Sequence, residues 1–325
     1  MSQDALERLY RPIVPDLALV ESEILAALEA DRHEIGEMTA HVGRYSGKKM
    51  RPAIALLIAK KCGGILPRHH RLGAVLEMIH LATLVHDDVI DGADMRRRSA
   101  TANFKWSNFD AVLLGDILFA RAINLLGRLG DAGALDELTQ AVSTLCEGEI
   151  LQNRHRRNAE LDEALYYRII EDKTAILYAA GCGLAAHLAG APLLVVEALR
   201  TYGLELGTAF QIVDDVLDLV GDEATVGKSL GTDLRNGKVT LPVIFMRESA
   251  TPADRARLVA VMRGEGTDAD AAWLRQALVD GGHVEAANVR ARDHIRRGLE
   301  AVSEALPDAA PDLAEIAGFV VVRAR

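Results

Sequence analysis

The chain has 325 residues, of which half are hydrophobic and 4% are aromatic, and its formal net charge is −10. The acidic balance argues against nonspecific binding of nucleic acid, and the length allows two domains or one large helical domain. The most apolar stretch, residues 176–196, contains a histidine, several glycines and a proline, so we expect a buried helix and no integral membrane protein.

Helical periodicity recurs along nearly the whole chain, and glycine and proline are not clustered, so the sequence predicts an all-α fold. The chain start carries acids and prolines in place of a basic end and an apolar core, so we expect no signal peptide. Cys62, Cys146 and Cys182 are odd in number and form no CxxC pair. They fit thiols of a cytoplasmic protein better than a disulfide framework or a zinc site.

The first periodic segment, Leu17 to Met38, is typical of an amphipathic surface or dimer helix. Pro52 is suited to open the next helix, Ala53 to Lys61. Lys48 and Arg51 would then lie at a positive helix N-terminus, where an anion is stabilised. Taken alone, a solvated basic turn explains these two residues better.

An acidic motif ends the next predicted helix, His70 to Asp91. Asp87, Asp88 and Asp91 form Asp-Asp-x-x-Asp after a long apolar run, and Gly92 follows. Residues four apart share a helix face, so Asp87 and Asp91 lie one above the other. The glycine places these carboxylates at a helix C-terminus.

Basic residues flank this motif on both sides. His80 stands two helical turns before Asp87, although a lone histidine is more often structural than functional. The run Arg96, Arg97 and Arg98 follows the motif, and arginine suits bidentate phosphate binding. The alternative for the run is an exposed loop without a ligand.

Two polar segments follow in the middle of the chain. Glu147-Gly148-Glu149 and Gln152 begin a polar segment that ends in the arginines within 154–157, which we interpret as a solvated helix end. Lys173 and Thr174 stand just ahead of the buried run, where a lysine is costly unless it is paired. We therefore expect Lys173 to face the carboxylates or a phosphate.

The acidic motif occurs a second time, as Asp214, Asp215 and Asp218, again at the end of an apolar helix and preceded by Phe210 and Gln211. A glycine-punctuated loop beyond it carries Lys228 and Lys238, without the spacing of a Walker motif. From Thr251 onward the sequence predicts ordinary amphipathic helices.

Carboxylates at a helix C-terminus oppose the helix dipole, which costs roughly 0.3–1 kcal/mol per charge. One such motif is explained by a solvated helix end, but two on apolar helices indicate a bound cation. All the candidate ligands are oxygens, which favours Mg²⁺ or Mn²⁺ over Zn²⁺ and implies a phosphate ester as the partner.

The acids could hold a diphosphate only through divalent ions, while the separate basic groups suit a second anion bound without metal. This pattern fits a reaction in which one diphosphate leaves and another is retained, with metal-assisted C–O ionisation to a carbocation. Thr174 and Gln211 could then supply oxygen dipoles, and Phe210 a cation–π face.

Together these residues resemble the trans-isoprenyl diphosphate synthases, the polyprenyl synthetase family, over about Gly47 to Pro242. The matching pieces are Gly47-Lys48 with Arg51-Pro52, Asp87–Asp91 with Arg96-Arg97, Gly115-Asp116, Lys173-Thr174, Phe210-Gln211 with Asp214–Asp218, and Gly237-Lys238 before Thr240-Leu241-Pro242. Their shared order and spacing make the resemblance specific. The family commonly has Gly and Pro where this chain has Arg98 and Ala100, which affects which two arginines hold phosphate.

The resemblance implies one all-α domain over residues 1–325, with a motif-bearing core at 47–242 and C-terminal helices at 243–325. It implies a helical bundle around a central cavity, usually a homodimer. It also implies roles for three groups of residues. Three Mg²⁺ would be held by Asp87, Asp88, Asp91, Asp214, Asp215 and Asp218. The allylic diphosphate would be held by Arg96, Lys173, Lys228 and Lys238, and isopentenyl diphosphate by Lys48, Arg51, His80 and Arg97.

Product length in such an enzyme is set by the helix that precedes the first motif. Ala82 and Thr83 are small, which predicts a cavity open to at least Ile79 or Leu76 and a product of about C30–C50 from a farnesyl or geranylgeranyl primer. The alternatives are a shorter-chain synthase, a non-catalytic subunit of a heteromeric synthase, a class I terpene cyclase, and a metal-binding helical scaffold without a reaction. The intact second motif and the full set of basic groups argue against the last three.

Overall fold

The computed structural model describes residues 8–29, 32–43, 45, 47, 49–96, 99–220 and 232–322. Lys48, Arg97, Arg98 and Lys228 lie outside the described residues. The elements, in chain order, are η1 (Arg11–Ile13), α2 (Val14–Leu28), α3 (His33–Gly43), α4 (Met50–Lys61), α5 (Pro67–Ile90), β1 (Met95–Arg96), β2 (Ser99–Ala100), α6 (Ala102–Lys105), α7 (Asn108–Gly127), α8 (Ala132–Arg154), α9 (Glu163–Ile170), η2 (Glu171–Ala175), α10 (Ile176–Leu188), α11 (Leu193–Val220), α13 (Thr232–Arg235), α14 (Leu241–Ser249), α15 (Pro252–Arg263), α16 (Asp268–Asp280), α17 (His283–Ala305), η3 (Pro307–Ala309) and α18 (Ala310–Val322).

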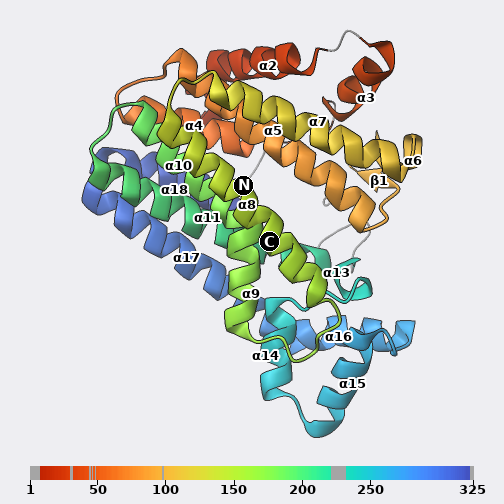
Figure 1. Cartoon of the computed structure of the whole chain (residues 1–325). Helices are drawn as coiled ribbons and strands as arrows, with labels where there is room; N and C mark the ends of the chain where they lie inside the picture. Colours follow the sequence, from red (N-terminus) through yellow and green to blue (C-terminus); the bar gives the residue numbers. More distant parts are fainter. Residues whose placement is uncertain are drawn as a thin grey trace.

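The long helices pack side by side in a bundle, which confirms the predicted all-α class (Figure 1). Helix α5 packs against α2, α4, α7 and α10, while α11 packs against α10 and α17. Helices α14, α15 and α16 gather at one end of the bundle, at the bottom of Figure 1. The two motif-bearing helices, α5 and α11, therefore share α10 as a neighbour.

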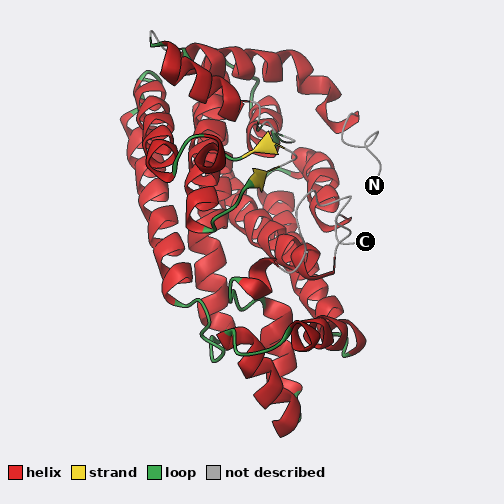
Figure 2. Cartoon of the chain, turned by 90° about the vertical axis from the view of Figure 1, so that its right-hand side faces the viewer, coloured by secondary structure: helices red, strands yellow, loops and turns green. Residues whose placement is uncertain are grey.

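A two-stranded hairpin interrupts the helices directly after α5, and the sequence reading did not predict it (Figure 2). Strands β1 and β2 are antiparallel, with Met95 opposite Ala100 and Arg96 opposite Ser99. The Thr101 hydroxyl closes the base by donating to the Ala93 carbonyl at 2.6 Å. The hairpin therefore holds Arg96 close to the acidic end of α5.

The N-terminal helices differ from the prediction of one segment over 17–38. Helix α2 ends at Leu28, and Glu29 is extended, with φ −58° and ψ 133°, before α3 begins at His33. The prediction was wrong because periodicity alone does not reveal a break between two amphipathic helices. Helix α4 also begins at Met50, earlier than predicted, because Pro52 needs no N–H partner in the first turn.

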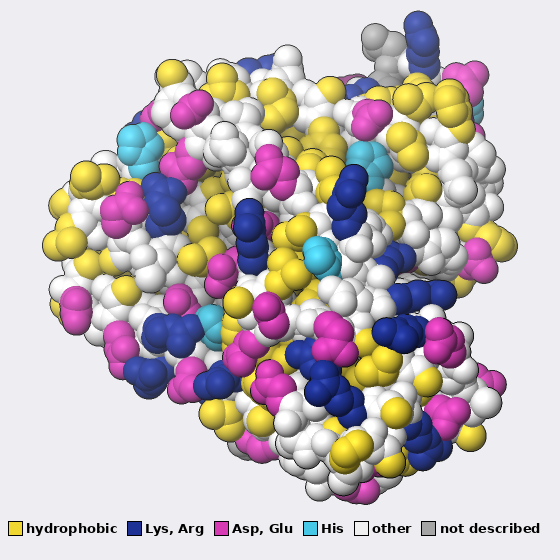
Figure 3. All heavy atoms as spheres, turned by 60° about the horizontal axis from the view of Figure 1, so that its bottom comes forward, with side chains coloured by type: hydrophobic (Ala, Val, Ile, Leu, Met, Phe, Trp, Pro, Cys, Tyr) yellow, Lys and Arg dark blue, Asp and Glu magenta, His cyan; other side chains and the backbone are white. Residues whose placement is uncertain are grey.

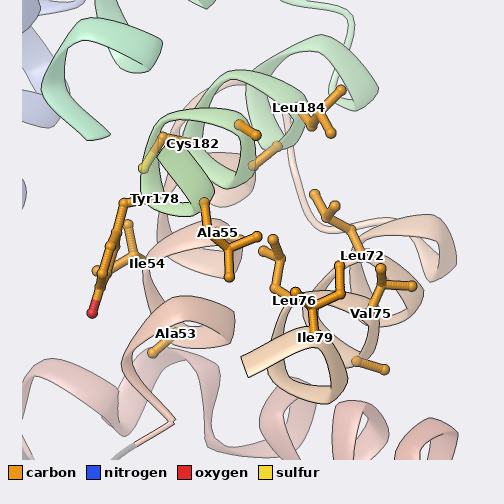
Figure 4. Packing of buried hydrophobic residues seen from close by; sticks show 14 of the residues in the cluster. Ala53, Ile54, Ala55, Leu72, Val75, Leu76, Ile79, Tyr178, Cys182 and Leu184 are labelled. Atoms are coloured by element: carbon orange, nitrogen blue, oxygen red, sulfur yellow. The ribbon is translucent and has the colours of Figure 1, made fainter. Parts of the chain in front are cut away.

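Within the described part of the chain, the apolar side chains form two buried clusters. The larger one is built around α4, α5 and α10, where Figure 4 shows Leu76 and Ile79 of α5 beside Ala55 of α4. A Cβ added at Gly181 of α10 would lie 2.9 Å from Leu76 Cδ1, so the helices approach closely. The smaller cluster joins the C-terminal half of α11 to α9, α14, α15, α16 and α17.

Acidic and basic side chains are interspersed on the face drawn in Figure 3. Within the ranges that the structure describes, no helix is long and apolar enough to cross a membrane.

Candidate functional site

The first acidic motif lies where α5 ends. Asp87 and Asp88 belong to the last helical turn, and Asp91 caps the helix, its N–H donating to the Asp87 carbonyl at 2.8 Å. The predicted C-terminal position of these carboxylates is confirmed. Asp88 is buried, whereas Asp87 and Asp91 are partly exposed. Three negative charges are thus gathered at the negative end of a helix dipole, where only opposite charges can stabilise them.

Each acid of this motif faces a basic side chain from elsewhere in the chain. Arg96 of β1 contacts Asp88 Oδ1 through Nε at 2.8 Å and through a terminal nitrogen at 2.7 Å. Lys173 Nζ lies 3.8 Å from Asp87 Oδ2, and Lys238 Nζ lies 3.3 Å from Asp91 Oδ2. The expectation that Lys173 faces the carboxylates is confirmed by this geometry.

Burial and ion pairing pull the pKa values of these acids in opposite directions. Burial raises the pKa of Asp87 and of Asp88 above the ordinary aspartate value, and Lys173 and Arg96 offset that rise only in part. Burial also acts on Asp91, but Lys238 and a second cation, Arg156, outweigh it and hold the pKa of Asp91 below its ordinary value. Asp91 is therefore the most firmly ionised acid of the motif.

The second motif lies in the last two turns of α11 and is more deeply buried. Asp215 accepts hydrogen bonds from the Tyr166 hydroxyl at 2.7 Å and from Gln211 Nε2 at 2.8 Å. Burial, and then the nearby charge of Asp233, raise the pKa of Asp215 to about 7. Asp218 Oδ2 accepts from the Asp233 N–H at 2.9 Å, and Asp214 is half-buried.

Among the described residues, two series of contacts connect the two motifs. Lys238 contacts Asp91 and also Asp233 Oδ1, both at 3.3 Å, and the Asp233 backbone reaches Asp218. On the other side, Lys173 faces Asp87, while its neighbour Thr174 donates from Oγ1 to Gln211 Oε1 at 2.9 Å. Residues more than 120 positions apart in sequence are thereby brought into one polar cluster.

The second series of contacts depends on an irregular helical turn. Lys173 and Thr174 lie in η2, a π-helical turn between α9 and α10, and such turns often occur at functional sites. Helix α8 lies against this turn at Gly148, where an added Cβ would stand 2.5 Å from the Lys173 backbone nitrogen. Because only glycine permits packing this close, the contact at Gly148 fixes the position of η2 relative to α8.

A second group of site side chains is formed by one arginine and two aromatic residues, Arg51, Tyr178 and Phe210. The Arg51 guanidinium carbon lies 4.5 Å from the centroid of the Tyr178 ring, and the rings of Tyr178 and Phe210 are 5.9 Å apart. Arg51 Nε is buried and has no hydrogen-bond partner among the described residues. His80 is partly exposed on α5, and its carbonyl accepts from Thr83 Oγ1 at 2.7 Å.

Of the residues assigned to product length, Ile79 and Ala82 belong to the larger cluster, whereas Thr83 does not. Ile79 and Ala82 are fully buried, and Thr83 is partly exposed. Leu76 is likewise buried against α10. The structure therefore places these residues along α5 before the acids, with Leu76, Ile79 and Ala82 in the core.

Several residues of the cluster were missed by sequence reasoning. Glu149 forms a close ion pair with Lys173, and Gln152 Oε1 accepts from Lys173 Nζ at 2.9 Å. Tyr166 and Asp233 reach the second motif from α9 and α13. No local motif marks these residues. Only the helical spacing of Glu149 and Gln152, three apart on one face, could have indicated a shared partner.

The expectation that the arginines at the end of α8 form a solvated helix end was wrong for Arg156. Its terminal nitrogen lies 2.5 Å from Asp91 Oδ1, and only 23% of its side chain is exposed. Arg157 fits that reading in its side chain, which is exposed, although its backbone N–H donates to the Gly237 carbonyl at 2.7 Å. Arg154 is likewise exposed.

The side chains predicted to bind metal are all carboxylates, and carboxylate oxygens suit Mg²⁺. In the part of the chain that is described, no three His, Cys, Asp or Glu side chains stand close enough together to hold an ion as they are. The acids of the first motif instead face their basic partners. Asp88 Oδ2 is buried without a hydrogen-bond partner among the described residues, so this oxygen remains available to a cation. The donor set thus fits Mg²⁺ once the basic groups turn to another anion.

Comparison with known proteins gives concordant matches. The family description "polyprenyl synthetase" matches residues 32–278. The chain is 40% identical over 263 residues to "heptaprenyl diphosphate synthase component 2" of Geobacillus stearothermophilus, covering 81% of each chain. It is 36% identical to octaprenyl diphosphate synthase of Escherichia coli strain K12, covering 93% of this chain and 94% of the relative. A polyprenyl synthase structure from Caulobacter crescentus CB15, complexed with calcium and isoprenyl diphosphate, gives a TM-score of 0.93 at 36% identity and covers 98% of both chains.

Proposed function

Since the chain belongs to the polyprenyl synthetase family and is a trans-polyprenyl diphosphate synthase, a prenyltransferase, we propose that it condenses isopentenyl diphosphate with an allylic diphosphate of the farnesyl or geranylgeranyl type. We propose a trans-polyprenyl product of about C30–C50. The observation that carries this proposal is the polar cluster that joins both acidic motifs to Lys173 and Lys238.

The proposed cofactor is Mg²⁺, as three ions, for which Mn²⁺ can substitute. Asp87, Asp88 and Asp91 would hold it on one side, and Asp214, Asp215 and Asp218 on the other. Bound Mg²⁺ supplies charge neutralisation and Lewis acidity at the leaving diphosphate. The oxygen-only donor set supports this assignment, as does Asp88 Oδ2, which has no hydrogen-bond partner among the described residues.

The basic residues of the cluster would bind the allylic diphosphate. Arg96, Lys173 and Lys238 each contact an acid of the first motif. When those acids turn to metal, the three cations are left beside a bound anion and can donate charge-assisted hydrogen bonds to its oxygens. Lys228, assigned to the same diphosphate, lies outside the described residues.

The second diphosphate would be bound without metal by Arg51 and His80, together with Lys48 and Arg97, which lie outside the described residues. Stacking on Tyr178 orients the Arg51 guanidinium, and its Nε, which has no partner within the described ranges, offers a donor to phosphate. Isopentenyl diphosphate keeps its C–O bond to the diphosphate during the reaction. Its diphosphate does not have to be activated as a leaving group, so charge pairing with basic side chains is enough to hold it.

The remaining groups would stabilise and shield the allylic cation. The oxygens of Thr174 and Gln211 are fixed by their mutual hydrogen bond, and oxygen dipoles held in place stabilise positive charge without reorganising. Phe210 lies one turn before Asp214, so its ring can face the cation.

We further propose that two copies of the chain associate through the exposed apolar side chains of α7. Phe109, Val112 and Leu113 are spaced three and four apart on one helical face, and Phe109 is 73% exposed. Phe104 of α6 and Ile150 of α8 are exposed large hydrophobic residues as well. Because a relative is named a synthase component, a heteromer is the alternative use of the same surface.

A product assay tests the proposed reaction. Purified protein is incubated with radiolabelled isopentenyl diphosphate, farnesyl diphosphate and Mg²⁺, with and without EDTA, and the dephosphorylated products are separated by chain length. Metal-dependent prenyl alcohols of about C30–C50 are expected. A stop at C15 or C20 would favour a shorter-chain synthase. No elongation by folded protein with any allylic primer would favour a non-catalytic subunit.

A further inference from the structure

The loop between α8 and α9 brings one more cation to the first acidic motif. The terminal nitrogen of Arg156 lies 2.5 Å from Asp91 Oδ1, on the opposite carboxylate oxygen from Lys238. Both partners are about three-quarters buried, with 23% of Arg156 and 24% of Asp91 exposed. Asp91 thus has two basic partners, while Asp87 and Asp88 each contact one among the described residues.

The backbone that carries Arg156 is held in place from the opposite side of the site. The next residue, Arg157, has a positive φ of 62°, and its N–H donates to the Gly237 carbonyl at 2.7 Å. Arg247 of α14 donates to the carbonyls of Ala159 and Leu161 at 2.6 and 2.8 Å. A left-handed conformation outside glycine is uncommon and is retained only where its surroundings impose it.

The loop therefore holds Arg156 in a fixed position. Its neighbour Arg157 is hydrogen-bonded to Gly237, the residue that precedes Lys238. The guanidinium has further hydrogen-bonding capacity, since Arg156 Nε is buried and has no hydrogen-bond partner among the described residues. A planar guanidinium can bind two oxygens of one phosphate at once, whereas a single carboxylate oxygen uses only part of its donors.

We propose that Arg156 is a further binding residue for the allylic diphosphate. This inference rests on the proposed function. In the substrate-free protein Arg156 neutralises Asp91, and when Asp91 becomes a metal ligand the guanidinium turns to an oxygen of the diphosphate. Arg156 then acts beside Lys238, from a loop that the family resemblance did not assign.

The experiment measures binding of a non-reactive farnesyl thiodiphosphate to the full chain by calorimetry, at fixed Mg²⁺. Wild type is compared with Arg156→Gln, Arg156→Lys and the matched control Arg154→Gln, which removes an exposed charge two residues away. We expect about a tenfold weaker affinity for Arg156→Gln and a smaller loss for Arg156→Lys, because lysine keeps the charge but not the planar fork. Arg154→Gln should bind as wild type does.

Two further probes assign the loss to the diphosphate itself. Inorganic diphosphate with Mg²⁺ should show the same weakening in Arg156→Gln, whereas isopentenyl diphosphate without metal should bind unchanged. Thermal unfolding of each variant is recorded in parallel, so that a destabilised loop is recognised.

Affinity within twofold of wild type would overturn the proposal and make Arg156 a structural clamp on Asp91. Tighter binding by Arg156→Gln would also overturn it, because Arg156 would then compete with metal for Asp91. If wild type itself neither binds the analogue nor elongates a primer, the proposed function fails as well. A wild type that does both, with an unaffected Arg156→Gln, refutes only the role of Arg156.

Discussion

The Thr174 hydroxyl is the side-chain group whose removal should affect the reaction most selectively. It donates to Gln211, which donates in turn to Asp215. Thr174→Val keeps the shape and removes the dipole, so we expect kcat to fall about tenfold or more with little change in KM. Steady-state kinetics with farnesyl diphosphate measure this, and Thr174→Ser should retain most of the activity. An unchanged kcat for Thr174→Val would remove Thr174 from the reaction.

Individual residues differed in how far they could be predicted from sequence. The two acidic motifs and Lys173 were predictable because charge at the end of an apolar helix is anomalous in its local context. Arg156 was misread, because an arginine at a polar helix end looks the same whether it meets water or a carboxylate 65 positions away. Tyr166 and Asp233 were missed for a related reason, since their partners are set by the tertiary packing of α9 and α13 against α11.

The packing of α8 against η2 should tolerate no side chain at Gly148. A Cβ there would meet the Lys173 backbone nitrogen at 2.5 Å and Asp172 Cβ at 2.8 Å, so one element has to move. Gly148→Ala should lower the free energy of unfolding by about 1–3 kcal/mol and reduce activity by displacing Lys173. Urea unfolding and the product assay test both effects. Gly127→Ala in α7, where a Cβ meets nothing within 4 Å, should be neutral or stabilising.

The stabilisation contributed by the contact between α11 and α17 should depend on pH through the ionisation of Glu205. Its carboxylate contacts His294 Nδ1 at 2.6 Å and Arg297 at 3.1 Å. Burial alone raises the pKa of Glu205, but His294 and Arg297 outweigh it, so the folded pKa lies below the ordinary value of 4.5. The stabilisation is therefore present above about pH 4.5 and is lost as pH falls through the folded pKa.

Glu205→Gln should accordingly lower the free energy of unfolding by about 1–3 kcal/mol at pH 7, with a difference from wild type that shrinks below pH 4.5. Urea unfolding at several pH values gives this difference directly. Glu300→Gln, which removes an exposed partner of Arg296, should have little effect at any pH. A difference that stays constant down to pH 3.5 would show that packing, and not charge, accounts for the loss.

At the level of elements, the sequence predicted the helices that are long and strongly periodic and placed both motifs at their ends. It did not predict the break between α2 and α3 or the hairpin after α5. Periodicity measures which face is buried, and it continues across a short break when both helices cover the same core. The hairpin is too short for alternation to be visible, and its closure depends on the Thr101 side chain.

Association of the whole molecule should depend on the apolar face of α7. Replacing Phe109 and Leu113 together with glutamate places two charges on a face that would be buried between copies, where unpaired charge is strongly unfavourable. We expect a dimer for wild type by light scattering and a monomer for this double variant. Lys105→Glu, a charge change on the neighbouring α6, should leave the dimer intact. A monomeric wild type that becomes active only with added cell extract would favour the heteromer.

In the proposed reaction, product length would be set by the space open to the growing tail across the whole molecule, and Ala82 would offer the most direct control over it. Ala82 lies five residues before Asp87, about 7.5 Å along α5, and it is fully buried beside Ile79 and Leu76. A product tail that grows from the acids along α5 must displace these packed side chains. A large side chain at Ala82 would block that path, whereas removal of one further down would extend it.

Ala82→Phe should therefore shorten the main product to about C15–C20, and Ile79→Ala should lengthen it beyond the wild-type distribution. Both are measured in the product assay. Because Phe is forced into a packed core, its effect has to be separated from general destabilisation, which is expected at about 1–3 kcal/mol. Ala287→Phe provides this control, since Ala287 is equally buried but belongs to the other hydrophobic cluster. If Ala82→Phe folds and its product distribution matches wild type, the tail does not follow α5, and another wall must limit the cavity.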